Sequence, residues 1–238
     1  MQDFAGSIIR VMELLIFADP EIWSVILLSL QVTISAVLIS ALIGLPLGAW
    51  LAMSRFWGHR GVVVSLNAMM GLPPVVVGLL VYMMLSNAGP LGILHLLYTP
   101  TAMVIAQVVL VIPIIASLTY QTCRDLLAEY REQFASFGIR GIDRLQVILY
   151  EARHSLLTAI LAGFGRAIAE VGAVMIVGGN INHLTRVMTT TIALETSKGN
   201  LEIALALGVV LLLISLLVNI LLAYAGTFGA KYSRGQHV

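Results

Sequence analysis

The chain has 238 residues, of which 59% are hydrophobic and only 11% are charged, and its formal net charge is +1. Its mean hydropathy of +0.99 is too high for a water-soluble globular domain. The small net charge argues against nucleic-acid binding, which requires a basic face that neutralises phosphates. The single cysteine, Cys123, has no disulfide partner within the chain. The composition therefore indicates a protein that lies in a lipid bilayer.

Long uncharged stretches indicate membrane-spanning helices. No charged residue lies between Glu21 and Arg55, and none lies from Gly61 to Cys123. A run of ~18 apolar residues is already long enough to cross a bilayer. Gly, Pro and Asn residues between positions 87 and 100 divide the second stretch, because they do not continue a helix. The sequence predicts an all-α membrane protein with five transmembrane helices, over about residues 25–53, 62–86, 101–120, 156–177 and 203–225.

The distribution of basic residues predicts the orientation. Five spans place the two termini on opposite sides, and residues 1–20 are expected to form a short amphipathic helix at the outer surface. If the loop after the first span is cytoplasmic, nine basic residues lie on the cytoplasmic side and three on the other, which satisfies the positive-inside rule. The N-terminus is then outside and the C-terminus is cytoplasmic. The nine are Arg55, Arg60, Arg124, Arg131, Arg140, Arg144, Arg153, Lys231 and Arg234, and the three are Arg10, Arg186 and Lys198.

The segment 121–155 is the only sizeable polar stretch, and this topology makes it cytoplasmic. At about 35 residues it is too short for a domain with its own core, so we expect a docking element. The chain has no Gly-rich loop ending in Gly-Lys-Ser or Gly-Lys-Thr, so any use of ATP requires another chain. We therefore expect residues 1–238 to be a single transmembrane domain without catalytic residues or cofactors. No metal site is expected either, because the histidines are scattered along the topology.

A helix-turn-helix pattern lies within segment 121–155. Glu132, Gln133 and Phe134 are followed after three residues by Gly138, and after nine more by Ile148. A short helix carrying Glu132 would end at Gly138, which tolerates positive φ, and a second helix would leave at a new angle. The spacing resembles the EAA signature of permease subunits of binding-protein-dependent ABC importers, with other residues at its Ala-Ala and Leu-Pro positions. The resemblance implies a helix that docks on an ATPase, with these coupling residues: Glu132, Gln133, Phe134, Gly138, Arg140 and Arg144.

Two further stretches strengthen the resemblance. The stretch Gly71–Leu79 contains Pro73 and Pro74 and resembles the double-proline stretch of sulfate, molybdate and tungstate permeases. The runs Gly163–Ile181 and Thr189–Gly199 are similar to the tungstate-type permease subunit in particular. The resemblance extends over about residues 72–222 and identifies the chain as similar to tungstate-type ABC importer permeases, in the wider molybdate/sulfate/tungstate oxyanion permease family.

The resemblance carries several expectations about the assembly. It implies a type I ABC importer permease fold, a homodimer, two copies of a cytoplasmic ABC ATPase, and an extracytoplasmic binding protein that delivers a tetrahedral oxyanion. It also implies a bacterial or archaeal cytoplasmic membrane. The similarity to tungstate-type permeases in particular implies tungstate as the substrate. Molybdate and sulfate remain alternatives because all three are tetrahedral dianions.

Candidate pathway or gate residues occur in the second and fourth spans. Pro73 and Pro74 remove two backbone donors, so we expect a kink that serves either a gate or helix packing. In the fourth span, Gly163, Arg166, Ala167 and Glu170 share one helix face, together with Ala173 and Val174. Arg166 and Glu170 are spaced to pair. The pair is either a charge on the pathway or a structural ion pair, and the sequence leaves both open.

Two other classes of membrane protein fit less well. An intramembrane protease would require a nucleophile or metal motif, and the spans contain no Gly-x-Ser-x-Gly and no His-Glu-x-x-His. A secondary transporter driven by an ion gradient typically has an internal repeat with broken helices in matched positions, and the sequence shows no such repeat.

Overall fold

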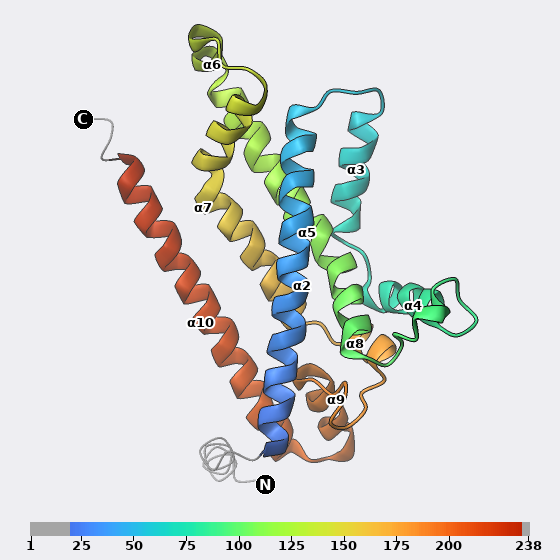
Figure 1. Cartoon of the computed structure of the whole chain (residues 1–238). Coiled ribbons are helices and arrows are strands. Elements are labelled where there is room, and N and C mark those ends of the chain that lie inside the picture. Colours follow the sequence, from blue (N-terminus) through green and yellow to red (C-terminus); the bar gives the residue numbers. More distant parts are fainter. Residues whose placement is uncertain (1–19, 235–238) are drawn as a thin grey trace. The chain divides into compact units, whose positions relative to one another are not determined.

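The computed structural model describes residues 20–234, and every regular element in this range is helical. The amphipathic helix expected over residues 1–20 lies outside the described residues, apart from Pro20. The elements in Figure 1 are α2 (Pro20–Met53), α3 (His59–Met69), α4 (Pro74–Leu85), the short 3-10 helix η1 (Gly92–Leu94), α5 (Pro100–Glu129), α6 (Arg131–Phe137), α7 (Gly141–Ile168), α8 (Gly172–Gly178), α9 (Met188–Lys198) and α10 (Leu201–Arg234).

Four described helices are long and apolar enough to cross a membrane, namely α2, α5, α7 and α10 over Leu201–Val218. The pair α3 and α4 makes a fifth only if the two helices count as one span, because they are bent by 103° at the break between them. The prediction of a single helix over 62–86 is therefore wrong. Pro74 begins α4, and Pro73 before it is extended at φ −63° and ψ 122°. The residue before a proline is disfavoured in helical geometry, so a kink was expected and a full break is observed.

The third and fourth predicted spans also differ from the observed helices. Helix α5 continues to Glu129, so much of the expected loop 121–155 is helical. Pro113 lies within α5 and does not end it. The expected helix over 156–177 is divided, because α7 begins at Gly141 and ends at Ile168, and the separate helix α8 follows after three residues.

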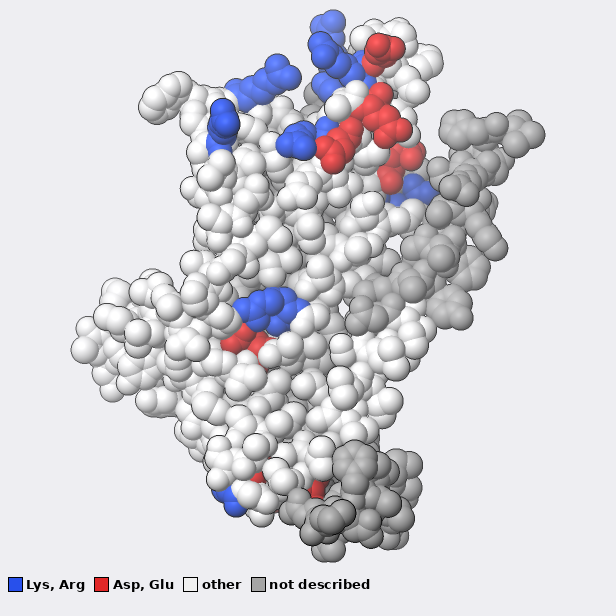
Figure 2. Space-filling view, turned by 180° about the vertical axis from the view of Figure 1, so that it is seen from behind, with Lys and Arg blue, Asp and Glu red and all other residues white. Residues whose placement is uncertain are grey.

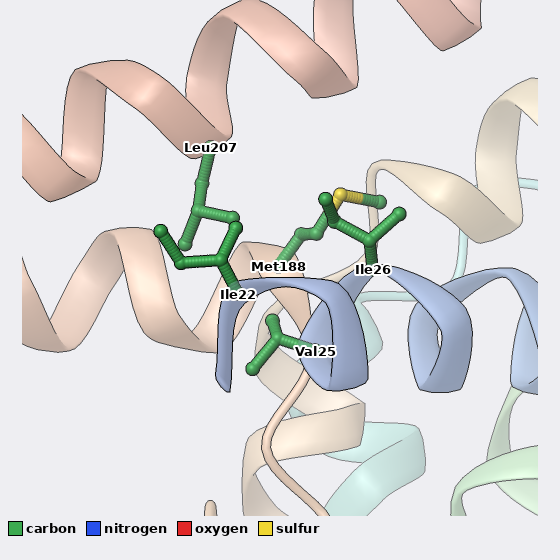
Figure 3. Close-up of a cluster of buried hydrophobic side chains, with 5 residues drawn as sticks. All are labelled: Ile22, Val25, Ile26, Met188 and Leu207. Carbon is green, nitrogen blue, oxygen red and sulfur yellow. The ribbon is translucent and has the colours of Figure 1, made fainter. Parts of the chain in front are cut away.

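The described chain consists of two compact units. The first contains residues 20–36, 73–107 and 166–217. One of its hydrophobic clusters joins the first turns of α2 to the start of α9 and to α10. In Figure 3, Ile22 lies next to Leu207. The cluster consists of Ile22, Val25, Ile26, Met188 and Leu207. Burying each such side chain stabilises the fold by roughly 1.5 to 3 kcal/mol, so this cluster holds the ends of three helices together.

Helix α4 packs on α8 in the first unit through residues without bulky side chains. A Cβ atom added at Gly78 would lie 2.7 Å from Cα of Ala173, and Ala173 is fully buried. A Cβ atom added at Gly172 would lie 2.8 Å from Cγ2 of Val75. The small residues of the sequence segment after Gly163 therefore serve close helix packing within this chain.

The second unit contains residues 37–72, 108–165 and 218–234. Helix α2 crosses α5 closely, because a Cβ atom added at Gly48 would overlap the carbonyl oxygen of Ala116. A hydrophobic cluster at the ends of α2 and α5 includes buried Cys123 and joins them to α6 and α7. Its buried members are Ala49, Cys123, Leu127, Phe134 and Ile148.

The contact between α4 and α8 can be tested by adding one methyl group. Gly78→Ala should lower the free energy of unfolding by about 1 to 3 kcal/mol, because the new Cβ meets backbone atoms of Ala173 that cannot move independently of α8. Gly61→Ala is the matched control, since Gly61 is also helical and its Cβ would meet nothing within 4 Å. Thermal unfolding in detergent measures both variants, and equal unfolding temperatures would contradict the proposed packing.

Candidate functional site

Glu170 lies in the break between α7 and α8, and its side chain is only 3% exposed. Its carboxylate oxygen Oε2 accepts a hydrogen bond from Nη1 of Arg166 at 2.6 Å. Oε1 accepts the backbone N–H of Ala173 at 3.0 Å, and the backbone carbonyl of Glu170 accepts the hydroxyl of Thr189 at 2.8 Å. One residue thus connects the end of α7, the start of α8 and the first turn of α9.

The pairing of Arg166 and Glu170 that their spacing predicts is present, but the continuous helix face is not. Glu170 lies outside α7, and Ala173 belongs to α8. An N–H in the first turn of a helix has no partner within that helix. The break is possible because the Glu170 carboxylate accepts such an N–H, that of Ala173 in α8. Nε2 of Gln107 likewise donates to the carbonyl of Ala167 in the last turn of α7, at 3.2 Å.

The predicted pathway residues are only partly brought together. Arg166 and Glu170 are in contact, and buried Ala167 lies beside them. Pro73 and Pro74 lie at the start of α4, whose Val75 packs on Gly172, so the two helix breaks are neighbours in the first unit. Gly163 is different, because it packs against α5: a Cβ atom there would lie 2.9 Å from Cγ1 of Val111.

A small polar cavity of about 10 Å³ lies beside the break. This volume is comparable to the space that one water molecule requires. Polar side chains from α2, α5, α9 and the break line the cavity: Ser29, Thr33, Gln107, Glu170 and Thr189. Oε1 of Gln107 is buried without a hydrogen-bond partner in the described chain. Gln107 was not among the predicted site residues, although a lone amide within an apolar span is a usable sequence signal.

A second polar cluster lies at the end of α9. The carboxylate of Glu195 accepts hydrogen bonds from Nζ of Lys198 at 2.8 Å and from Nδ2 of Asn200 at 2.7 Å. The hydrogen bond from Lys198, followed by the one from Asn200, holds the pKa of Glu195 below its usual value. Glu195, Lys198, Glu21 and Arg186 line a pocket of about 230 Å³, which therefore carries both signs of charge.

The expected helix-turn-helix is present in the second unit. Helix α6 ends at Gly138, whose φ of +67° lies in the left-handed region and whose N–H donates to the carbonyl of Phe134. Gly141, also at positive φ, begins α7. A Cβ atom at Gly138 would meet nothing within 4 Å, so the backbone conformation alone favours glycine there.

Helix α6 has one buried side and one exposed side. Phe134 is buried in the cluster formed with Cys123, Leu127 and Ile148, and the Arg144 guanidinium lies 5.1 Å from the centre of its ring. Glu132 and Gln133 are exposed, as is Arg140 after the turn. Phe137 is 78% exposed. It was not among the predicted coupling residues, although an exposed large apolar residue on a docking helix indicates a contact with a partner. Figure 2 shows charged side chains gathered around α6 and the adjoining ends of α5 and α7.

Comparison with known proteins relates the chain to transport proteins. Residues 44–226 match the family described as binding-protein-dependent transport system inner membrane component. A tungstate uptake system permease protein from Peptoclostridium acidaminophilum is 42% identical over 92% of this chain and 96% of its own length. A probable anion ABC transporter permease protein from Haloferax volcanii is 40% identical over 83% of this chain and 88% of its own length. A tungstate uptake system permease protein from Campylobacter jejuni is 36% identical over 67% of each chain. Relatives named for molybdenum or sulfate transport are 23% to 29% identical.

The burial of Glu170 predicts unequal effects of the two charge-removing substitutions. Arg166→Gln leaves a buried carboxylate without its cation and should cost about 3 kcal/mol of unfolding free energy. Glu170→Gln should cost only about 1 kcal/mol, because its amide oxygen can still accept the N–H of Ala173. The Arg166 side chain, which is 30% exposed, can also turn toward polar surroundings.

The double variant Arg166→Gln with Glu170→Gln should be no less stable than Glu170→Gln alone, since neither charge then remains unpaired. Chemical or thermal unfolding in detergent of the unsubstituted protein, the two single variants and the double variant gives the coupling free energy of the pair. A larger loss in Glu170→Gln than in Arg166→Gln would contradict the assignment of the buried charge.

Proposed function

We propose that this chain, which belongs to the family of binding-protein-dependent transport system inner membrane components, is the permease subunit of an ATP-driven importer of a tetrahedral oxyanion, in the first place tungstate. The observation that carries the substrate proposal is the 42% identity, over 92% of the chain, to a protein named as a tungstate uptake permease. Molybdate and sulfate are the alternatives, and the lower identity of the relatives named for them makes them secondary. An importer driven by an ion gradient is disfavoured by the family to which the chain belongs.

The assembly that we propose follows the pattern implied by the sequence. Residues 1–238 form one permease domain in a bacterial or archaeal cytoplasmic membrane, with the N-terminus outside and the C-terminus in the cytoplasm. Two copies form a homodimer, two copies of a separate ATPase bind on the cytoplasmic side, and an extracytoplasmic protein delivers the oxyanion. The unequal distribution of Lys and Arg between the two sides supports this orientation. The permease itself is non-catalytic, and ATP hydrolysis belongs to the partner chain.

Helix α6 is the ATPase-coupling element in this proposal. Its exposed residues Glu132, Gln133 and Phe137 face away from the cluster that holds Phe134. A partner can therefore contact the exposed side without disturbing the attachment of α6 to its own unit. Gly138 sets the angle between α6 and α7, and Arg140 and Arg144 flank the contact. A push on α6 would then be transmitted through Phe134 to the ends of α2, α5 and α7.

The break around Glu170 is the proposed gate region, together with Pro73 and Pro74. Arg166 supplies a partly exposed positive charge suited to a dianion, and Glu170 limits how tightly an anion can bind there. The neighbouring polar cavity of about 10 Å³ is too small for an anion with five heavy atoms, so passage requires the broken helices to rearrange. Ala167 belongs to this region through its carbonyl, which Gln107 holds. The contribution of Gly163 is indirect, through the close approach of α7 to α5.

Uptake measurements test the transport proposal. Cells that express the chain with its ATPase and binding protein should accumulate tungsten from tungstate, measured by mass spectrometry of the metal. An equal concentration of molybdate or sulfate should reduce this accumulation less than twofold, whereas a strong reduction by sulfate would contradict the substrate assignment. Accumulation that persists without the ATPase would contradict the ATP-driven mechanism.

The coupling role of α6 can be tested at Gly138 with two substitutions that differ in backbone preference. Gly138→Val should strongly reduce co-purification of the ATPase, because a β-branched residue is strained at a φ of +67°. Gly138→Asn should retain most of it, since Asn tolerates the left-handed region and the site has room for a side chain. Normal ATPase binding and normal uptake in Gly138→Val would show that the turn is not part of the coupling contact.

A further inference from the structure

A cavity of about 660 Å³ lies in the second unit, between the ends of α2 and α5 and the side of α6 that carries Phe134. Five arginines line it, and none of the described residues in its lining is acidic. They come from four segments of the chain: Arg55 after α2, Arg124 on α5, Arg131 on α6, and Arg140 and Arg144 at the turn and on α7. The fold thus brings Arg55 beside four arginines of the polar segment 121–155.

These arginines are only partly neutralised within the chain. Arg124 pairs with Asp125 at 3.2 Å, and Arg144 lies over the ring of Phe134. Nε of Arg144 is buried and has no hydrogen-bond partner among the described residues. Arg55, Arg131 and Arg140 make no ion pair with any described carboxylate. Like charges in one cavity repel each other, so the arrangement favours a bound anion.

An apolar groove of about 680 Å³ adjoins this cavity. It lies between α2 and α7 and is lined almost entirely by apolar atoms, with Leu45, Pro46 and Trp50 on one side and Ile142 and Leu149 on the other. Met53 lines both the groove and the arginine cavity, so the two adjoin each other at this residue. Both α2 and α7 have the length and composition of membrane spans. The groove therefore leads from the apolar surface of two spanning helices to the arginines.

We propose that the arginine cavity and the apolar groove together bind one anionic phospholipid, with its phosphate among the arginines and an acyl chain along the groove. A lipid matches both parts, because it joins a phosphate to a hydrocarbon chain, whereas a free anion would leave the groove empty. Arginine also suits phosphate because its planar guanidinium donates two parallel hydrogen bonds. The bound lipid would tie α2, α6 and α7 together.

This inference does not depend on the transported substrate, although Gly138, Arg140 and Arg144 of the cavity also belong to the proposed ATPase-coupling region. Residues Arg131, Phe134, Ala135 and Gly138 of α6 and its turn line the cavity, whereas Glu132, Gln133 and Phe137 do not. A lipid on the inner side of α6 and a protein on its outer side can therefore be bound at the same time.

Trp50 provides a direct probe, because it lines the groove and is 56% exposed. The chain has three tryptophans, so Trp23→Phe with Trp57→Phe leaves Trp50 as the only fluorophore. The full chain in detergent micelles is titrated with phospholipids that carry bromine on their acyl chains, which quench nearby tryptophan. Brominated phosphatidylglycerol should reach half-maximal quenching at about a tenfold lower mole fraction than brominated phosphatidylcholine.

The arginines are tested in the same single-tryptophan background. Arg55→Gln with Arg131→Gln should bring the two lipids within about twofold of each other, because both substitutions remove positive charge from the cavity. Arg153→Gln is the matched control and should keep the preference, since Arg153 lies over Tyr150 and does not line the cavity. Unchanged unfolding temperatures show that the variants are folded.

Four outcomes would overturn the proposal. The first is equal quenching by the two lipids in the unsubstituted background. The second is that the double variant Arg55→Gln with Arg131→Gln still prefers phosphatidylglycerol but no longer co-purifies with the ATPase. That result would assign these arginines to a protein partner. The third is loss of the preference in Arg153→Gln, which would indicate general surface charge. The fourth is full displacement of the lipid effect by millimolar inorganic phosphate, which would indicate a small-anion site.

Discussion

A helix that ends within an apolar environment leaves backbone groups without partners, and this constraint determines the architecture around Glu170. In hydrocarbon each such group costs several kcal/mol, so a broken helix persists only where the chain satisfies the freed groups. Glu170 accepts the N–H of Ala173 in the first turn of α8, and Gln107 donates to the carbonyl of Ala167 at the end of α7. Thr189 donates to the backbone of Glu170 itself. The break is thus a tightly bonded element of the fold.

The contacts of the Arg166 and Glu170 pair support a structural role, and its role on the pathway stays a proposal. Glu170 is structural, because both of its carboxylate oxygens have partners within the chain and the side chain is buried. Arg166 is held at one nitrogen by Glu170 and remains partly exposed. A charge fixed in this way can meet an anion without the full cost of an unpaired ion in the membrane. The neighbouring break at Pro73 and Pro74 gives the same unit a second place where helices can change direction.

The helix-turn-helix of the second unit follows a different principle, in which one buried aromatic residue fixes a short surface helix. Helix α6 has seven residues, too few to be stable by its own hydrogen bonds. Its stability comes from Phe134, which is inserted among residues of α2, α5 and α7. Its remaining sides can then carry exposed residues and line the arginine cavity. Phe134 thus attaches the helix, and its other sides are free for the docking and the lipid binding that we propose.

The sequence by itself determined the class of the protein, the positions of the apolar segments, the turn at Gly138 and the pairing of Arg166 with Glu170. Those features depend on local properties: hydrophobic length, the backbone freedom of glycine, and the spacing of opposite charges. The tertiary structure alone decided that the fourth span is broken, because this break depends on partners such as Gln107 and Thr189 from distant segments. In the second span the sequence predicted a kink at Pro73 and Pro74, and the structure showed that it is a full break. It alone also brought five arginines from four segments into one cavity and showed Gly163 as a packing residue of α5 and α7. These features depend on which surfaces meet, and no local pattern of residues specifies that.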